Sequence, residues 1–384
     1  MITNRFMLNE TSYFGRGARE ILPQEITARK FKKVLVVTDK ALYELGVTKK
    51  VTEVLDEANI AYSVFCDLKP NPTVKNVKDG VQKREEIEAD VIVAVGGGSA
   101  IDTSKAIAII TTNKEFSDVV SLNGVADTKN KALPIIALPT TAGTAAEVTI
   151  NYVITDEDTK TKMVCVDPHD IPIMAIIDSE LMESMPKSLA AATGMDALTH
   201  AIEGYITKGA WEMSDMFHMK AIKMIFANLP KAVNEKDEKA IENMGLAQYI
   251  AGMGFSNVGL GIVHSLAHQL GAVYDTPHGL ANAILLPHVM QYNGEVCSER
   301  FAQILTELGI DTTSMNTKEI IQTMVSKIQE LAESVGITQS LSQVGVKEED
   351  IPMLANKAIK DVCTPGNPRD TSVEDMIAIY EKAL

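Results

Sequence analysis

The first half of the chain alternates short apolar runs with longer amphipathic stretches. The runs read KVLVVTD (33–39), AYSVFC (61–66), DVIVAVGGGS (90–99), LPIIALPTT (133–141) and IMAIID (173–178). Short runs rich in β-branched residues, separated by segments of helix length, indicate parallel strands that are buried on both faces. The pattern therefore predicts an α/β layer built on a parallel sheet.

The pattern changes along the rest of the chain. The stretch VTINYVITDEDTKTKMVCVD (148–167) alternates on either side of three acidic residues, which predicts a hairpin beside the sheet. After Pro186 the β-like runs end, and apolar residues recur at helical spacing with breaks such as NLPK (228–231). We expect an α/β domain over residues 1–185 and an all-helical domain over residues 186–384.

Composition excludes several classes of partner. The 384 residues include 36 Lys and Arg against 51 Asp and Glu, a net charge of −15, and no basic cluster is dense enough for nucleic acid. No uncharged apolar run reaches the roughly 18 residues of a membrane span, so we expect a cytoplasmic protein without a membrane partner. The four cysteines contain no C-x-x-C pair, so any metal ligands should be nitrogen and oxygen.

A strand runs into three glycines and then into a helix in AVGGGSAIDTSK. Gly96, Gly97 and Gly98 carry no side chain that would keep a phosphate from the backbone, and the positive end of a helix attracts anions. Ser99 and Asp102 have the spacing of a capping pair. The sequence favours a phosphate site here, and a simple tight turn is the alternative.

Two other strand ends have similar chemistry. PTTAGTAAE (139–147) and KPNP (69–72) both follow apolar runs and carry small or polar residues. Parallel strands bring such ends to one edge, where α/β folds bind their ligands. We therefore expect a ligand cleft at this edge of the sheet.

Asp39 ends the first apolar run. A carboxylate at this position can accept hydrogen bonds from ribose hydroxyls and would repel a 2′-phosphate, which favours NAD over NADP. The alternative is a solvated residue at a strand end. The acid precedes the glycines, which reverses the order of the usual dinucleotide fingerprint, so a dinucleotide site here would belong to another lineage of the fold.

Histidines and one aspartate recur at helical spacing in two apolar segments. Asp196 and His200 lie four apart in GMDALTHAIEGY, His264 and His268 lie four apart further on, and His278 follows. Residues four apart share a helix face, and a buried carboxylate needs a partner or a metal. The pattern predicts a site for Fe²⁺, Zn²⁺ or Co²⁺. Spacing alone selects neither the metal nor which of His264 and His268 binds it, and structural histidines are the alternative.

Several motifs resemble those of the iron-containing, group III alcohol dehydrogenases. They are GGGSAID, PTTAGTAAEVT, GMDALTHAIEGY, GMGFSNVGLGIVHSLAHQLGAVYDTPHGLANAILLPHV and CTPGNPR. The resemblance covers essentially the whole chain. It implies an NAD-binding α/β domain, a helical metal-binding domain, Fe²⁺ with Zn²⁺ as an alternative, and a homodimer whose N-terminal strand crosses to the partner subunit.

The resemblance also assigns roles to residues. It makes Asp196, His200, His264 and His278 the metal ligands, and it puts His268 beside the nicotinamide as a catalytic residue. The matching cofactor positions are Asp39, Asn71, Gly97, Gly98, Ser99, Asp102, Thr140, Thr141, Thr144, Asn151, Val153 and Lys162. Phe255 and Cys363 match positions that line the substrate pocket. The implied reaction is hydride transfer between NAD(H) and a short alcohol or aldehyde, with lactaldehyde and 1,2-propanediol as the expected pair.

Two other functions compete with this interpretation. A metal-dependent lyase or cyclase can also combine NAD with a metal, but a phosphate-bearing substrate needs several Lys or Arg residues nearby. Residues 190–207 and 250–290 contain none. A non-catalytic metal- or nucleotide-binding protein would not need both a dinucleotide cleft and an open metal site. The sequence leaves the physiological substrate, the direction of the reaction and the metal loaded in the cell undetermined.

Overall fold

The computed structural model describes residues 3–68, 70–159 and 161–384. The chain divides into two compact units, Met1–Met185 and Pro186–Leu384. Lys69, in the predicted KPNP strand end, and Lys160, in the predicted hairpin, lie outside the described residues.

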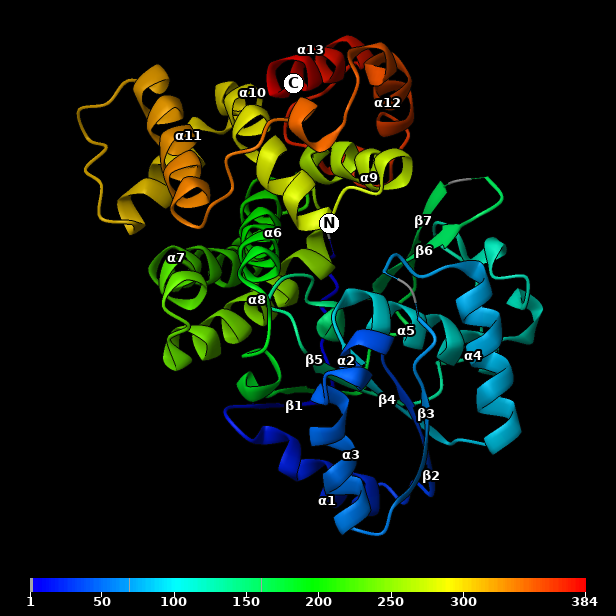
Figure 1. Cartoon of the computed structure of the whole chain (residues 1–384). Helices are drawn as coiled ribbons and strands as arrows, with labels where there is room; N and C mark the ends of the chain where they lie inside the picture. Colours follow the sequence, from blue (N-terminus) through cyan, green and yellow to red (C-terminus); the bar gives the residue numbers. More distant parts are fainter. Residues whose placement is uncertain (1–2, 69, 160) are drawn as a thin grey trace. The chain divides into compact units, whose positions relative to one another are not determined.

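The first unit contains a six-stranded sheet with the order β1-β8-β5-β4-β2-β3, in which every neighbouring pair is parallel (Figure 1). Its strands are β1 (Thr11–Phe14), β2 (Lys33–Val37), β3 (Ala61–Phe65), β4 (Val91–Gly96), β5 (Ile135–Pro139) and β8 (Met174–Ile177). Five of the six follow the apolar runs of the sequence. The prediction of a parallel α/β sheet is therefore confirmed.

Helices cover both faces of this sheet. They are α1 (Leu22–Ala28), α2 (Lys40–Glu44), α3 (Val47–Glu57), α4 (Val74–Ile87) and α5 (Gly98–Thr112). Val34 and Val36 of β2 pack in one cluster with α1 and α3, whereas Leu35 and Val37 pack in another with α4 and α5. Successive side chains of a strand point to opposite faces, so a strand that is apolar throughout needs both layers.

Two features of the first unit lie outside this central pattern. The predicted hairpin is confirmed as a separate antiparallel pair, β6 (Asn151–Asp156) and β7 (Thr161–Val166). The apolar pattern does not predict the edge strand β1, because its sequence, TSYF, is short and half polar. It pairs with β8 of its own chain. That an N-terminal strand crosses to a partner subunit stays a prediction.

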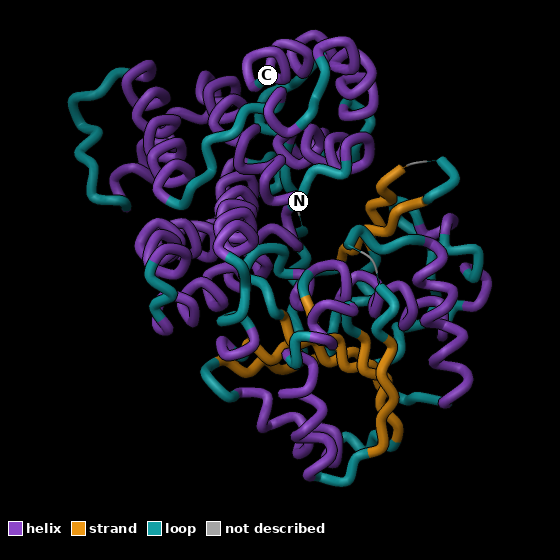
Figure 2. The backbone as a smooth tube through the Cα atoms, viewed as in Figure 1, coloured by secondary structure: helices purple, strands orange, loops and turns teal. Residues whose placement is uncertain are grey.

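The second unit is helical, and the strands shown in orange in Figure 2 all belong to the first unit. Its helices are α6 (Lys187–Ile206), α7 (Glu212–Asn234), α8 (Glu238–Val258), α9 (Ile262–Tyr274), α10 (His278–Glu307), α11 (Thr317–Ser334), α12 (Ile351–Ala358) and α13 (Val373–Ala383). The all-helical prediction is confirmed. The break expected at NLPK is wrong, because α7 continues through Pro230. Leu229, Ala232 and Val233 are buried on both sides of the proline, and their packing outweighs the lost hydrogen bond.

Among the described helices, no single one is long and apolar enough to cross a membrane. Helices α8 and α9 meet the same length and composition test only as a pair, and the chain bends by 102° between them.

A buried histidine fixes the contact between α6, α7 and α8. His218 of α7 is fully buried, and a Cβ atom added at Gly204 or Gly254 would lie 2.4 or 2.3 Å from its Nε2. Neither ring nitrogen has a hydrogen-bond partner among the described residues. Burial lowers the pKa of His218 to about 3, so the ring is neutral at pH 7. Gly204 of α6 and Gly254 of α8 thus let both helices approach His218 of α7 closely, and α6 carries the first residues of the candidate site.

Candidate metal centre and cofactor-binding loops

Helix α6 presents three polar side chains along one buried face. Asp196, His200 and Glu203 follow each other at intervals of four and three residues, the spacing that puts helical side chains on one side. Their exposed fractions are 1%, 5% and 1%. Since the surrounding α6 residues are mainly alanine and larger apolar side chains, these three groups must find partners inside the second unit.

Two further helices bring imidazoles to the same place. His264 lies in the first turn of α9, and its Nε2 is 3.0 Å from Nε2 of His200 and 3.9 Å from Oδ1 of Asp196. His278 is the first residue of α10, and its Nε2 is 3.6 Å from the same aspartate oxygen. The structure thus brings together all four residues that the resemblance names as metal ligands.

The donor set fits a divalent ion. Ligand atoms bound about 2.1 Å from a tetrahedral ion lie roughly 3.4 Å from each other, and the separations here are 3.0–3.9 Å. Burial lowers the pKa of His264 well below its usual range, and the neighbouring His200 and His278 lower it further. Burial also raises the pKa of Asp196, which His200 and Asn282 oppose. A bound cation favours neutral imidazoles as ligands, and its charge offsets the cost of burying an ionised carboxylate.

Asn282, one turn along α10 from His278, reaches into the donor set. Its Nδ2 donates to Oδ1 of Asp196 at 2.7 Å and lies 3.2 Å from Nε2 of both His264 and His278. Its own Oδ1 is buried without a hydrogen-bond partner among the described residues. The amide NH₂ group therefore lies among the donor atoms and orients the aspartate by a hydrogen bond.

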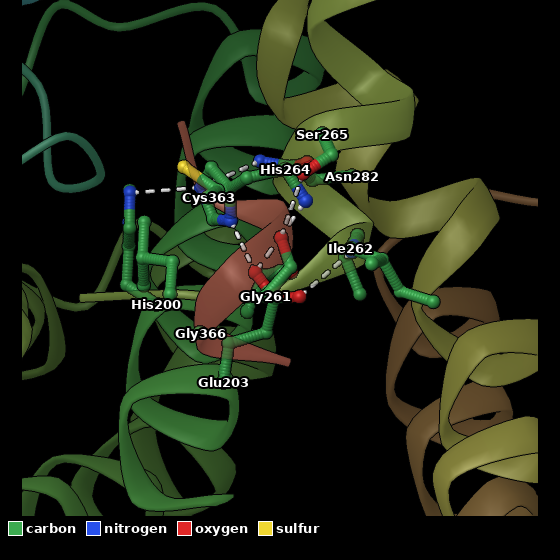
Figure 3. Close-up of polar contacts among 12 residues, drawn as sticks. His200, Glu203, Gly261, Ile262, His264, Ser265, Asn282, Cys363 and Gly366 are labelled. Carbon is green, nitrogen blue, oxygen red and sulfur yellow. Dashed lines mark hydrogen bonds and ion pairs between the residues drawn. The ribbon is translucent and has the colours of Figure 1, made fainter. Parts of the chain in front are cut away.

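Glu203 contacts His264 from the side away from the other ligands. Its Oε2 is 2.5 Å from Nδ1 of His264. Figure 3 draws the polar contacts of Glu203 as dashed lines. Burial raises the pKa of Glu203 to about 8, and hydrogen bonds from backbone N–H groups at the start of α9 lower it. A cation at the donor set would favour the ionised carboxylate further.

His268 lies one turn further along α9, next to the four-residue set but outside it. Its ring stacks on His278 with centroids 5.5 Å apart, and its Nδ1 is 2.9 Å from Oδ2 of Asp361. Cys363 lies beside this pair, because its backbone N–H donates to the other oxygen of Asp361 at 3.0 Å. Phe255, from α8, stacks on His200 at a centroid distance of 4.2 Å. His268 and Phe255 therefore contact rings of the four-residue set, and Cys363 lies beside the pair of His268 and Asp361.

The carboxyl ends of β4 and β5 bring the predicted phosphate loop together. A Cβ atom added at Gly97 would lie 3.1 Å from Oγ1 of Thr141, and one added at Gly98 would lie 3.0 Å from Cγ2 of Thr144. The absence of a side chain at these glycines thus lets the two loops approach each other closely. The predicted capping pair is wrong: α5 begins after Gly97, with no side-chain cap.

Asp102 bonds to the hairpin instead of capping its own helix. Its Oδ2 accepts a hydrogen bond of 3.0 Å from the backbone N–H of Val153. The fully buried Lys105, one turn along α5, donates to the carbonyl oxygens of Thr149 and Asn151 at 2.5 and 2.9 Å. Burial raises the pKa of Asp102 to about 7, although Lys105 opposes this. Helix α5 and the hairpin are therefore held together where the sequence predicts cofactor contacts.

The other cofactor candidates lie at the same edge or on the hairpin. Asp39 lies two residues after β2, and its Oδ1 accepts from the backbone N–H of Leu42 at 2.9 Å, so it caps α2. Asn71 accepts from Nζ of Lys162, on β7, at 2.8 Å. Thr140 is buried directly after β5, and Ser99 lies in the first turn of α5.

Four residues of these sites are not among those that the sequence pattern predicts. Glu203 follows His200 by three residues and Asn282 follows His278 by four, so helical spacing could have found both. Lys105, three residues after Asp102, had the same signal. Asp361 lies 93 residues from its partner His268, and no local pattern connects them.

Comparison with known proteins agrees with this architecture. Residues 9–179 match the family model of iron-containing alcohol dehydrogenases, and residues 190–384 match the model of the C-terminal part of the Fe-containing alcohol dehydrogenase family. The chain therefore belongs to the iron-containing alcohol dehydrogenase family and is an oxidoreductase.

Individual relatives match over the full length. Lactaldehyde reductase of Escherichia coli K12 is 52% identical, with all of both chains covered. The crystal structure of a 1,3-propanediol oxidoreductase superposes with a TM-score of 0.96 at 40% identity, again covering both chains completely. Sulfoacetaldehyde reductase from Bifidobacterium kashiwanohense, solved in complex with NAD⁺, has a TM-score of 0.86 at 29% identity and covers 100% of this chain and 99% of its own.

Proposed function

We propose that this protein is an NAD-dependent and Fe²⁺-dependent alcohol dehydrogenase that interconverts lactaldehyde and 1,2-propanediol. The observation that carries the proposal is the convergence of one buried carboxylate and three imidazoles, with nitrogens and oxygen 3.0–3.9 Å apart. The proposed substrate is that of lactaldehyde reductase, a relative that is 52% identical to this chain.

Asp196, His200, His264 and His278 would hold the ion, Fe²⁺ in the first instance and Zn²⁺ as the alternative. When bound, such an ion polarises a carbonyl oxygen and lowers the pKa of an alcohol, while NAD supplies or accepts the hydride. His268 would exchange the proton. Asp361 accepts from its Nδ1 and leaves Nε2 as the nitrogen that takes up or releases a proton. Phe255 and Cys363 would border the substrate.

The first unit would bind the dinucleotide and the second would bind the metal, with the domains divided at 185 and 186. Gly97, Gly98 and Ser99 would bind the diphosphate through backbone N–H groups at the start of α5. The remaining contacts would come from Asp39, Asn71, Asp102, Thr140, Thr141, Thr144, Asn151, Val153 and Lys162. The choice of NAD as cofactor is supported by sulfoacetaldehyde reductase, which has the same fold and was solved in complex with NAD⁺. We also propose a homodimer in the cytoplasm, joined through the N-terminal strand.

An activity panel tests the proposal. The protein is stripped of metal, reloaded anaerobically with Fe²⁺ or Zn²⁺, and assayed with NADH and lactaldehyde and, in reverse, with NAD and 1,2- or 1,3-propanediol. We expect turnover that depends on metal. The value of kcat/KM should be higher for 1,2-propanediol than for 1,3-propanediol by about 10-fold or more, the scale that one misplaced hydroxyl can produce. Absence of NAD(H) turnover with either metal would refute the function. A preference for 1,3-propanediol would refute only the substrate.

Removal of the charge at Asp39 should admit NADP. The carboxylate would repel a 2′-phosphate, and its Oδ1 also caps α2. Asp39→Asn keeps an oxygen for the cap and removes the charge, while Asp39→Gly removes both. We expect kcat/KM for NADP to rise about 10-fold or more in both variants, on the scale of 1.4 kcal/mol for one removed repulsion. Steady-state kinetics with both cofactors checks this, and an unchanged preference for NAD would reject Asp39 as the selector.

A further inference from the structure

We propose that Glu203 is a positioning residue of the metal centre. Its carboxylate selects the ring tautomer of His264 that directs the Nε2 lone pair at the other ligands, and it ties this ring to the start of α9. The inference rests on the proposed function, because it takes the four-residue set as the metal site. It assigns a role to a residue outside that set.

The contact between Glu203 and the ring determines where the imidazole proton lies. Oε2 of Glu203 is 2.5 Å from Nδ1 of His264, and both side chains are almost fully buried. A cation at the donor set would favour the ionised form of Glu203, and an ionised carboxylate can only accept, so Nδ1 would carry the proton in the metal-loaded protein. The opposite nitrogen, Nε2, is then unprotonated and lies 3.0 Å from Nε2 of His200. This is the tautomer that a metal ligand requires.

The same carboxylate holds the backbone on which His264 stands. Helix α9 begins after Gly261, which provides no side-chain cap for the first N–H groups. Oε1 of Glu203 accepts from the N–H of Val263 at 2.7 Å, and Oε2 accepts from the N–H of His264 at 3.4 Å. A Cβ atom at Gly261 would lie 2.9 Å from Oε1, so the glycine leaves room for this approach, which Figure 3 shows. A negative charge at a helix N-terminus is favourable in itself.

A variant at Asn367 can distinguish positioning of the His264 ring from simple capping of α9. It is also buried, and its Oδ1 accepts from the N–H of Ile262 at 3.4 Å, in the same first turn of α9. Its other side-chain hydrogen bonds are with Asn293, Arg369 and Thr371, not with the His264 ring. A variant at Asn367 therefore weakens the same helix start and leaves the imidazole hydrogen bond in place.

Glutamine is the sharpest substitution for Glu203. Its amide oxygen can still accept from the N–H of Val263, but its NH₂ group then faces Nδ1 of His264. Two donors cannot share this contact, so the ring must move its proton to Nε2 or lose the hydrogen bond. The change keeps the shape and opposes the tautomer that binds metal.

The test compares metal-free wild type with Glu203→Gln, Asn367→Ala and His264→Ala. Zn²⁺ is titrated against a competing chelator, the Tm of each metal-free protein is measured, and ¹⁵N spectra of selectively labelled histidines are recorded in the Zn²⁺-loaded state. We expect Glu203→Gln to bind Zn²⁺ about 10–100-fold more weakly, the usual effect of losing a partner of a metal-bound histidine. Asn367→Ala should have a lower Tm without metal and an affinity within about threefold of wild type. In the wild type, the His264 signals should show a protonated Nδ1 and a metal-bound Nε2.

Three results would overturn the inference. They are wild-type affinity in Glu203→Gln, an equal loss of affinity in Asn367→Ala, and a wild-type His264 that binds metal through Nδ1. The last is read from wild-type protein, so it decides the question even if Glu203→Gln does not fold. If His264→Ala binds Zn²⁺ as tightly as wild type, the ligand set of the proposed function fails instead, and the two failures are thereby distinguished.

Discussion

The Asp196→Asn variant is expected to fold, to bind NADH, and to lose most of its metal and its activity together. The substitution keeps the shape of the side chain but removes the only negative charge among the four proposed ligands. A neutral amide oxygen is a weaker ligand for a divalent ion than a carboxylate is. The affinity for Fe²⁺ or Zn²⁺ should fall by about 100-fold or more, because a ligand contributes more than the 10–100-fold of an outer hydrogen-bond partner.

Metal analysis per chain and NADH fluorescence titration on the same sample check this result. Thr199→Val is a matched control on α6, because its buried hydroxyl donates to the carbonyl oxygen of Met195, at 2.8 Å, and not to a proposed ligand. It should keep wild-type metal content. If Asp196 serves only to accept the hydrogen bond from Asn282, the Asn variant would lose about 1–3 kcal/mol of stability and keep its metal. A fully loaded, active Asp196→Asn protein would therefore refute the proposed metal centre.

Alanine substitutions of the two histidines of α9 should have different effects. His264→Ala removes a proposed ligand and leaves Glu203 without its ring partner, so the affinity for metal should fall about 100-fold or more and metal content should fall at limiting metal. His268→Ala removes the ring that Asp361 orients beside the ligand set. It should keep its metal, and turnover should fall by about 10²–10⁴-fold, the range for loss of a group that transfers a proton.

The comparison depends on two measurements made on each variant. Metal content per chain reports the ligand role, and kcat at saturating metal reports the proton-transfer role. Excess Zn²⁺ or Fe²⁺ should restore part of the metal in His264→Ala and should change nothing in His268→Ala. Equal metal loss from both variants would mean that their roles have been divided wrongly.

Much of the fold was predictable because its signals are local. Strand β4 is apolar along its whole length and β2 from Val34 to Val37, since helices cover both faces of the sheet, and the sequence shows this directly. The hairpin of β6 and β7 has the alternation of a strand pair with one buried face. Local signals failed where packing overrides them: α7 continues through Pro230 because buried residues flank it, and β1 is a strand only because β8 lies beside it.

The candidate metal ligands were also detectable as types and spacings. Asp196 and His200 lie four apart in an apolar helix, and His264 and His268 have the same spacing, so a metal site could be inferred from the sequence alone. Spacing could not decide between His264 and His268. The resemblance favours His264, and in the structure its Nε2 lies 3.0 Å from His200, while Nδ1 of His268 bonds to Asp361.

The sequence by itself determined the alternation of apolar strands and helices in the first half of the chain, the helical character of the second half and the residue types of the candidate metal centre, because helical and strand periodicities depend on neighbours within a few positions. The tertiary structure alone decided which distant groups meet. Glu203 reaches the start of α9, 60 residues away, and Asp361 reaches His268 across 93 residues. Such contacts depend on how whole helices pack, and a buried carboxylate or imidazole is then stable only where packing supplies its hydrogen-bond partner.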